Sequence, residues 1–157
     1  MKPLDAFVGA TLRPALVVFG LATCLPIVLA VNLDLGNRLL FAGQLDPGPA
    51  SALLLRHWGL MICGVGVLMI VAAARPWLRF ETMVFAAVEK IVLVGLVLSN
   101  LGQPWDRAYR GSAILDGIIS LYCLLYFVSS YGRPHAWTIA DGGSGQRPAA
   151  GQSAANV

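Results

Sequence analysis

The spacing of charged residues limits the possible folds of this chain more than any other feature of its sequence. Four long stretches carry almost no charge; they lie between Arg13 and Asp34, Arg56 and Arg75, Glu81 and Asp106, and Arg110 and Arg133. A helix needs about 20 mostly apolar residues to cross a lipid bilayer. We therefore predict four membrane-spanning helices near residues 14–32, 53–74, 81–101 and 112–131.

Composition supports a membrane protein and argues against a soluble one. Of the 157 residues, 57% are hydrophobic and only 12% are charged, whereas soluble domains carry about 25% charged residues. The tryptophans lie at or just beyond predicted span ends, where the indole can meet both lipid and water; they are Trp58, Trp77, Trp105 and Trp137. Prolines follow the second, third and fourth spans, as expected where helices end.

The predicted fold class is all-α, a bundle of four transmembrane helices that run up-down-up-down. Residues 1–13 form an N-terminal segment, 14–131 the membrane domain, and 132–157 a flexible tail rich in Gly, Ser, Ala and Gln. The first span has an alternative interpretation as a cleaved secretory signal, because Lys2 and Arg13 precede its apolar core, Pro26 breaks the helix, and Val28-Leu-Ala30 resembles the pattern before a cleavage site. Its uncharged run exceeds the usual signal core, so we expect a retained span.

The first loop, residues 33–52, contains an amphipathic segment. Leu35 and Leu39 share a helical face from which Asp34 and Arg38 are excluded. We expect either a short helix that lies at the membrane interface or an ordinary connector.

Three charged residues of the predicted spans do not mark span ends, namely Glu89 and Lys90 in the third and Asp116 in the fourth. A charged group there costs roughly 2.5–3.5 kcal/mol, so such residues mark a function or a satisfied structural contact. Adjacent residues point about 100° apart on a helix, and we therefore expect Glu89 and Lys90 to seek different neighbours. The structural alternatives are contacts with other helices or a partner subunit, and a third span that begins later.

A polar pocket is the functional alternative for these groups. His57, Asn100, Asp116 and Ser120 are expected to form this pocket near the outer ends of their spans, with Glu89 and the adjacent Lys90 about 10 Å deeper. Asp116, Ser120 and Cys123 share one helical face, which we expect to point inward. Such a pocket can bind a small ligand or pass protons. Otherwise His57 is an interfacial anchor and Asp116 stabilises a helix start.

Small residues recur along one side of the second span. Gly59, Cys63 and Gly66 have helical spacing, which allows another helix to approach closely, either within the bundle or from a second copy of the chain. Cys24 and Cys123 also lie in predicted spans, and no C-x-x-C pair is present. We therefore expect no dithiol chemistry.

No motif predicts a catalytic residue, a cofactor or a metal site. Nucleophile elbows, phosphate-binding loops and dinucleotide fingerprints are absent, and His57 and His135 are predicted on opposite sides of the membrane. The basic residues behind the net charge of +3 flank the spans, which indicates topology and requires no nucleic-acid partner. The expected partners are the lipid bilayer and a homo-oligomer or larger membrane complex.

Three short segments carry a resemblance to a known family, and they are Arg56-His-Trp-Gly59, Ala72-Ala-Ala-Arg-Pro76 and Glu89-Lys90. In these segments, and in its size, span spacing and long first loop, the chain resembles small bacterial four-helix membrane proteins of the DoxX-like type. The resemblance covers roughly residues 10–131. It implies a compact bundle, and some members of that group are associated with redox complexes. It transfers no catalytic residue.

Two functions are compatible with these features. The first is a non-enzymatic accessory or assembly subunit of a larger membrane complex, in which Glu89 and Lys90 contact another subunit. The second is a membrane pocket protein that binds a lipid, quinone or other small ligand, or relays protons, through buried polar residues. A membrane-embedded enzyme ranks below both, because no catalytic signature is present.

The distribution of Lys and Arg predicts the orientation. Six of these residues lie on the side that holds both termini and the 75–80 turn, against four on the other side. This bias predicts a bacterial inner-membrane protein with both termini in the cytoplasm. We predict that a single cysteine in the 33–52 loop, in a background without the native cysteines, reacts with an impermeant maleimide added from outside. Labelling only from the cytoplasmic side would reverse the orientation.

Overall fold

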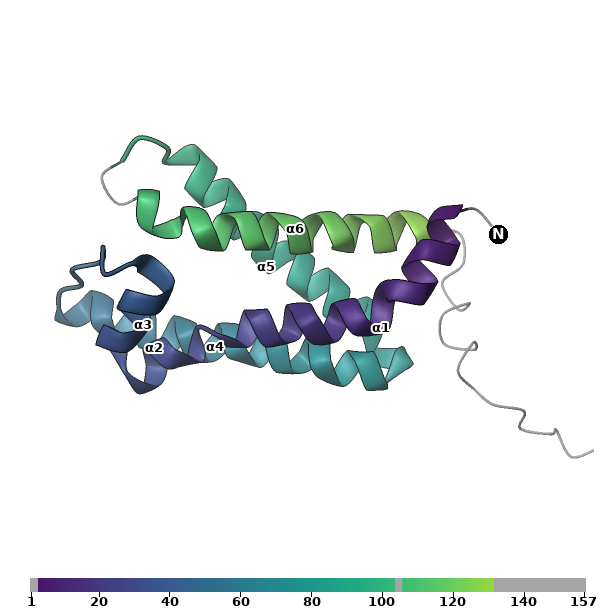
Figure 1. The fold of residues 1–157 in the computed structure, drawn as a ribbon, viewed down its shortest axis with the longest axis horizontal. Helices are drawn as coiled ribbons and strands as arrows, with labels where there is room; N and C mark the ends of the chain where they lie inside the picture. The colour runs from purple at the N-terminus through teal and green to yellow at the C-terminus, as the bar shows by residue number, and fades with distance from the viewer. Residues whose placement is uncertain (1–2, 104–105, 132–157) are drawn as a thin grey trace, which may run out of the picture.

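The computed structural model describes residues 3–103 and 106–131, and this part of the chain is all-α, as predicted. Four of its helical stretches are long and apolar enough to cross a membrane, and they are Pro3–Val31, Pro49–Ala74, Pro76–Ser99 and Asp106–Ser130. The predicted all-α bundle of four such helices is therefore confirmed (Figure 1). The expected flexible tail, Trp105, His135 and Trp137 lie outside the described residues.

The first long helix starts well before the predicted span. Helix α1 covers Pro3–Cys24, and after a turn at Pro26 the short helix α2 continues over Ile27–Val31. Backbone hydrogen bonding does not require apolar side chains, so a helix can begin before the apolar run. Asp5 and Arg13 are therefore also helical. Pro14 lies inside α1, where it offers no amide hydrogen, and Figure 1 shows that α1 is bent.

The amphipathic segment of the first loop forms a short helix. Helix α3 covers Leu33–Phe41, and the side chain of Asn32 caps it by accepting a 3.0 Å hydrogen bond from the amide of Leu35. The Asn37 side chain then fixes the following turn, since it donates to the Leu45 carbonyl at 2.7 Å and accepts from the Leu45 amide at 3.2 Å. The position of α3 at a membrane surface stays a prediction.

A tight turn joins the next two long helices. Helix α4 covers Pro49–Ala74, and the single 3₁₀ turn η1 at Pro76–Leu78 leads into α5 at Arg79–Ser99. The buried guanidinium of Arg79 donates to the carbonyls of Ala72 and Ala73, both at 3.1 Å. This cation satisfies carbonyls at the C-terminal end of α4, where the helix dipole also favours positive charge.

Helix α6, Asp106–Ser130, completes the bundle. Its first residue is buried and accepts hydrogen bonds from the Gly102 amide at 2.7 Å and the Arg110 guanidinium at 3.0 Å. The start of α1 and the end of α6 lie at the same end of the bundle, and the α3 loop lies at the opposite end, called here the loop end (Figure 1). Helices α4 and α5 meet at the 75–78 turn and diverge toward the loop end.

Two apolar clusters hold these helices together. The main cluster joins all four long helices through residues such as Leu16, Met69, Met83 and Ile119. A smaller cluster at the loop end packs Leu29, Phe41 and Ala108, with the Phe41 ring centred 5.1 Å from that of Tyr109. Large apolar side chains are also exposed on all four long helices, among them Val18, Leu60, Leu98 and Val128. This outer surface suits lipid better than water.

The small residues of the second predicted span lie against the first helix. A Cβ added at Gly66 would come within 2.5 Å of the Gly20 carbonyl oxygen and 2.6 Å of the Cys24 sulfur. A Cβ at Gly59 would meet the carbonyl of Pro26, and the Cys24 thiol donates to the Cys63 carbonyl at 3.5 Å. This contact is therefore one within the bundle, where α1 and α2 approach α4 closely.

Two glycines of α4 allow a matched test of this close contact. We predict that Gly66→Ala lowers the free energy of unfolding by about 1–3 kcal/mol, because the added methyl group forces α1 and α4 apart. Gly64 has open space around its Cα, so Gly64→Ala should leave stability unchanged or slightly raised. SDS titration in bicelles measures both variants, and equal effects would contradict the packing role of Gly66.

Candidate functional site

A buried ionic cluster joins α5 to α6. The Lys90 ammonium lies 2.9 Å from Oε2 of Glu89 and 3.1 Å from Oδ1 of Asp116. Lys90 and Asp116 are only 2% and 5% exposed, whereas the Glu89 side chain keeps 20% of its surface. One cation is thus shared by two carboxylates inside the bundle, and we call these three residues the charge cluster.

The expectation that Glu89 and Lys90 seek different neighbours is wrong for this pair. Their Cα–Cβ bonds do diverge along α5, but the lysine stem is long enough to return its ammonium to the neighbouring carboxylate. The 2.9 Å separation is a charge contact, because Oε2 of Glu89 has no hydrogen-bond partner of good geometry among the described residues. Asp116 is the different neighbour that Lys90 also reaches.

The face of α6 that carries Asp116 points inward, as expected. Asp116, Ser120 and Cys123 are 5%, 8% and 1% exposed. The Ser120 hydroxyl and the Thr23 hydroxyl of α1 are buried, and neither has a hydrogen-bond partner among the described residues. Polar atoms without partners are therefore found near the charge cluster, in a region where such groups are costly.

The other two predicted pocket residues lie elsewhere. His57 is exposed on α4, and it does not line the cavities described below. Asn100 caps the end of α5 and donates from its amide group to the Leu96 carbonyl at 2.8 Å. The structure thus groups Asp116 with Lys90 and Glu89, and it does not bring His57 or Asn100 into that group.

Three neighbouring cavities share lining residues, and two of them are lined by residues of the charge cluster. A small inner chamber of about 60 Å³ is lined by Lys90 and Asp116, and also by Thr23 and Ser112. A groove of about 390 Å³ runs between α4 and α5 with Glu89 in its wall. At the loop end, a pocket of about 500 Å³ lies between the segment after α3 and the helices α4, α5 and α6. We call these the inner chamber, the lateral groove and the loop-end pocket.

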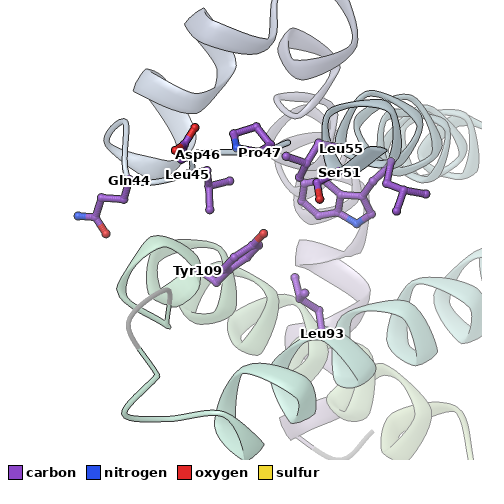
Figure 2. A pocket seen from close by; sticks show the side chains of 10 residues that line it. Gln44, Leu45, Asp46, Pro47, Ser51, Leu55, Leu93 and Tyr109 are labelled. Atoms are coloured by element: carbon purple, nitrogen blue, oxygen red, sulfur yellow. The ribbon is translucent and has the colours of Figure 1, made fainter. Parts of the chain in front are cut away.

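Two residues line all three cavities, Trp58 of α4 and Leu93 of α5. Figure 2 shows the loop-end pocket, where the hydroxyl of Tyr109 points into the space between Leu45 and Ser51. The lateral groove is lined by side chains on the outer surface, including Met61, which is 55% exposed. The three cavities are therefore neighbours between the outer surface and the loop end, and residues of the charge cluster line two of them.

The sequence placed Leu93 on the face of the third span that carries Glu89 and placed Tyr109 and Trp58 at span ends, but it identified none of the three as a cavity residue. Apolar and aromatic residues are ordinary components of a span, so neither their type nor their spacing separates a cavity wall from a packed core. Within the described residues no group of three His, Cys, Asp or Glu side chains could hold a metal ion. The apolar walls and the charge cluster can bind a ligand through shape, charge and hydrogen bonds.

The charge cluster can be tested by removing its cation. We predict that Lys90→Met lowers the free energy of unfolding by about 3–5 kcal/mol, because two buried carboxylates lose their partner. Adding Glu89→Gln and Asp116→Asn to that variant should restore most of the loss, measured by SDS titration in bicelles. Glu81→Gln removes an exposed carboxylate from the same helix and should change little. Equal losses in the single and triple variants would contradict a charge-based role.

Comparisons with known proteins identify no relative of this chain. No family model, curated protein or solved structure matches the chain. The resemblance to the DoxX-like group therefore stays a prediction, and the function has to be argued from the site itself.

Proposed function

We propose that this chain is a membrane pocket protein that binds a lipophilic molecule in the cavities between α4, α5 and α6. The observation that carries the proposal is that three cavities converge on Trp58 and Leu93, beside a buried charge cluster. Binding sites in membrane-helix bundles combine apolar walls with a few fixed polar groups. The region around Leu93 has both properties.

The lateral groove gives such a molecule a route from the bilayer. Its wall is almost entirely apolar, with Met61, Phe85 and Val92 exposed at its outer edge. A lipophilic molecule that leaves the hydrocarbon here keeps an apolar environment, so its transfer requires little desolvation. It then lies next to the Glu89 carboxylate, which is the most exposed group of the charge cluster.

The internal pairing of Lys90 favours a pocket over the alternative role as an accessory subunit. In that alternative, Glu89 and Lys90 need charges on another subunit to offset the cost of their burial. Lys90 instead has two carboxylate partners within its own chain, at 2.9 and 3.1 Å. The contact surface for another subunit then has to lie outside the charge cluster, and the described residues mark no specific place for it.

Photolabelling tests the pocket directly. We predict that a fatty alcohol carrying a diazirine on its chain, added to the protein in zwitterionic nanodiscs, gives saturable cross-links to groove residues such as Phe85 and Val92. Excess unlabelled fatty alcohol should suppress these cross-links, whereas labelling of the outer helix faces should not saturate. Peptide mass spectrometry locates the labelled positions.

Two leucines of α5 provide the variant and its control. Leu93→Trp fills the meeting point of the cavities and should remove most of the saturable labelling. Leu98→Trp adds the same side chain at a position that is 60% exposed and lines none of the three cavities, so labelling should persist. Absence of saturable labelling in the unmodified protein would overturn the proposed function.

A further inference from the structure

Acidic residues outnumber basic residues among the described residues that line the three cavities. Asp46 lines the loop-end pocket, Glu89 the lateral groove and Asp116 the inner chamber, and Lys90 is the one basic residue among the described residues that line them. Three acids against one base leave two negative charges when all four groups are ionised. Low-dielectric cavity walls concentrate the electric field of these charges, which raises the local concentration of ions of the opposite charge.

We propose that the ligand of this pocket is a cationic amphiphile, an organic ammonium group attached to an apolar chain. This inference rests on the proposed function, because it names the chemical class of the molecule bound there. A positive head group offsets the excess negative charge of the cavity walls, and an anionic head group adds to it. The apolar chain matches the walls of the lateral groove.

The loop-end pocket is the place for the head group. Asp46 is exposed at the loop end, and its carboxylate forms no hydrogen bond or ion pair with another described residue. Glu89, in contrast, already has Lys90 at 2.9 Å. The same pocket contains two aromatic rings, those of Trp58 and Tyr109, and an ammonium group within about 6 Å of such a ring is attracted to its face.

The geometry of the opening agrees with this assignment. In Figure 2 the Tyr109 hydroxyl and Leu93 lie on one side of the loop-end pocket, and Pro47 and Ser51 lie on the other. A head group between these walls meets the hydroxyl oxygens of Tyr109 and Ser51, which are acceptors for ammonium N–H groups or for water around a quaternary ammonium, and Asp46 lines the same pocket. The nearby Arg110 is engaged by Asp106 at 3.0 Å.

The chain then extends from the shared residues into the lateral groove. From Leu93 to Phe85 the groove follows α5 for eight residues, which is about 12 Å at 1.5 Å per residue. This length suits an alkyl chain of moderate length. A small ammonium ion without a chain would fill the head site alone and would lose the apolar contacts of the groove.

The test uses the diazirine photolabel with four unlabelled competitors in zwitterionic nanodiscs. Dodecyltrimethylammonium, dodecanol and dodecyl sulfate share one chain and differ in head-group charge, and tetramethylammonium supplies the head group alone. We expect dodecyltrimethylammonium to compete about tenfold better than dodecanol or dodecyl sulfate. Tetramethylammonium should compete weakly, since it makes no contact with the groove.

Two acids of the first loop provide the variant and its control. Asp46→Asn removes the charge from the loop-end pocket. In this variant dodecyltrimethylammonium should compete with the photolabel no better than dodecanol does. Asp34→Asn removes the same charge from the exposed face of α3, outside the pocket, and should leave the preference intact. Circular dichroism checks that both variants keep their helical content.

The outcomes separate this inference from the proposed function. Equal competition by the three long-chain compounds would overturn the cationic class while saturable labelling still supports a pocket. Absence of saturable labelling would remove the proposed function itself. A cation preference that survives Asp46→Asn would overturn the head-group site, and full competition by tetramethylammonium would overturn the amphiphile in favour of a free ammonium ligand.

Discussion

The charge of Lys90 is the constraint that organises the second half of this bundle. An ammonium group in an apolar interior must keep its partners, because desolvation costs more than any single contact returns. Its two carboxylates come from α5 itself and from α6, so the two helices are held in one register at this depth. In the first half, the same purpose is served by shape, since the glycine contact lets α1 and α4 approach closely. The bundle therefore consists of two helix pairs joined by different physical means.

The cavities lie where these two pairs meet. Helices α4 and α5 are connected by the short turn after Ala74, and they diverge toward the loop end (Figure 1). Helix α3 fills part of the resulting space by placing Phe41 against Trp58 and Tyr109. The remaining volume forms the loop-end pocket and the lateral groove. A divergence of two helices, closed at one end by a turn, thus creates the candidate site without any motif in the sequence.

The sequence predicted the long helices well, because a helix that crosses lipid needs a long stretch of residues with almost no charge. It placed their starts less well, since residues such as Asp5 and Asp106 continue a helix beyond the apolar run. It also identified Glu89, Lys90 and Asp116 as the unusual residues of the spans. Their pairing was harder to predict, because the direction of a Cα–Cβ bond says little about where a four-carbon stem ends. Leu93 could not be identified, because a leucine in a span carries no mark of the cavity beside it.

The composition of the charge cluster connects its structural role with binding. Two carboxylates share one ammonium, so the fully ionised cluster keeps one negative charge that no described cation compensates. Such a charge is stabilised by a positive group or by a bound proton, and it is most sensitive to groups that approach through the lateral groove, where Glu89 keeps part of its surface. In the binding mode proposed above, the apolar chain of a ligand would lie beside this charge in the lateral groove, whereas its ammonium group would lie in the loop-end pocket. By linkage, any ligand that binds only the folded bundle also stabilises it, so a ligand in the cavities would add to the stability that the charge cluster gives to the pair of helices α5 and α6.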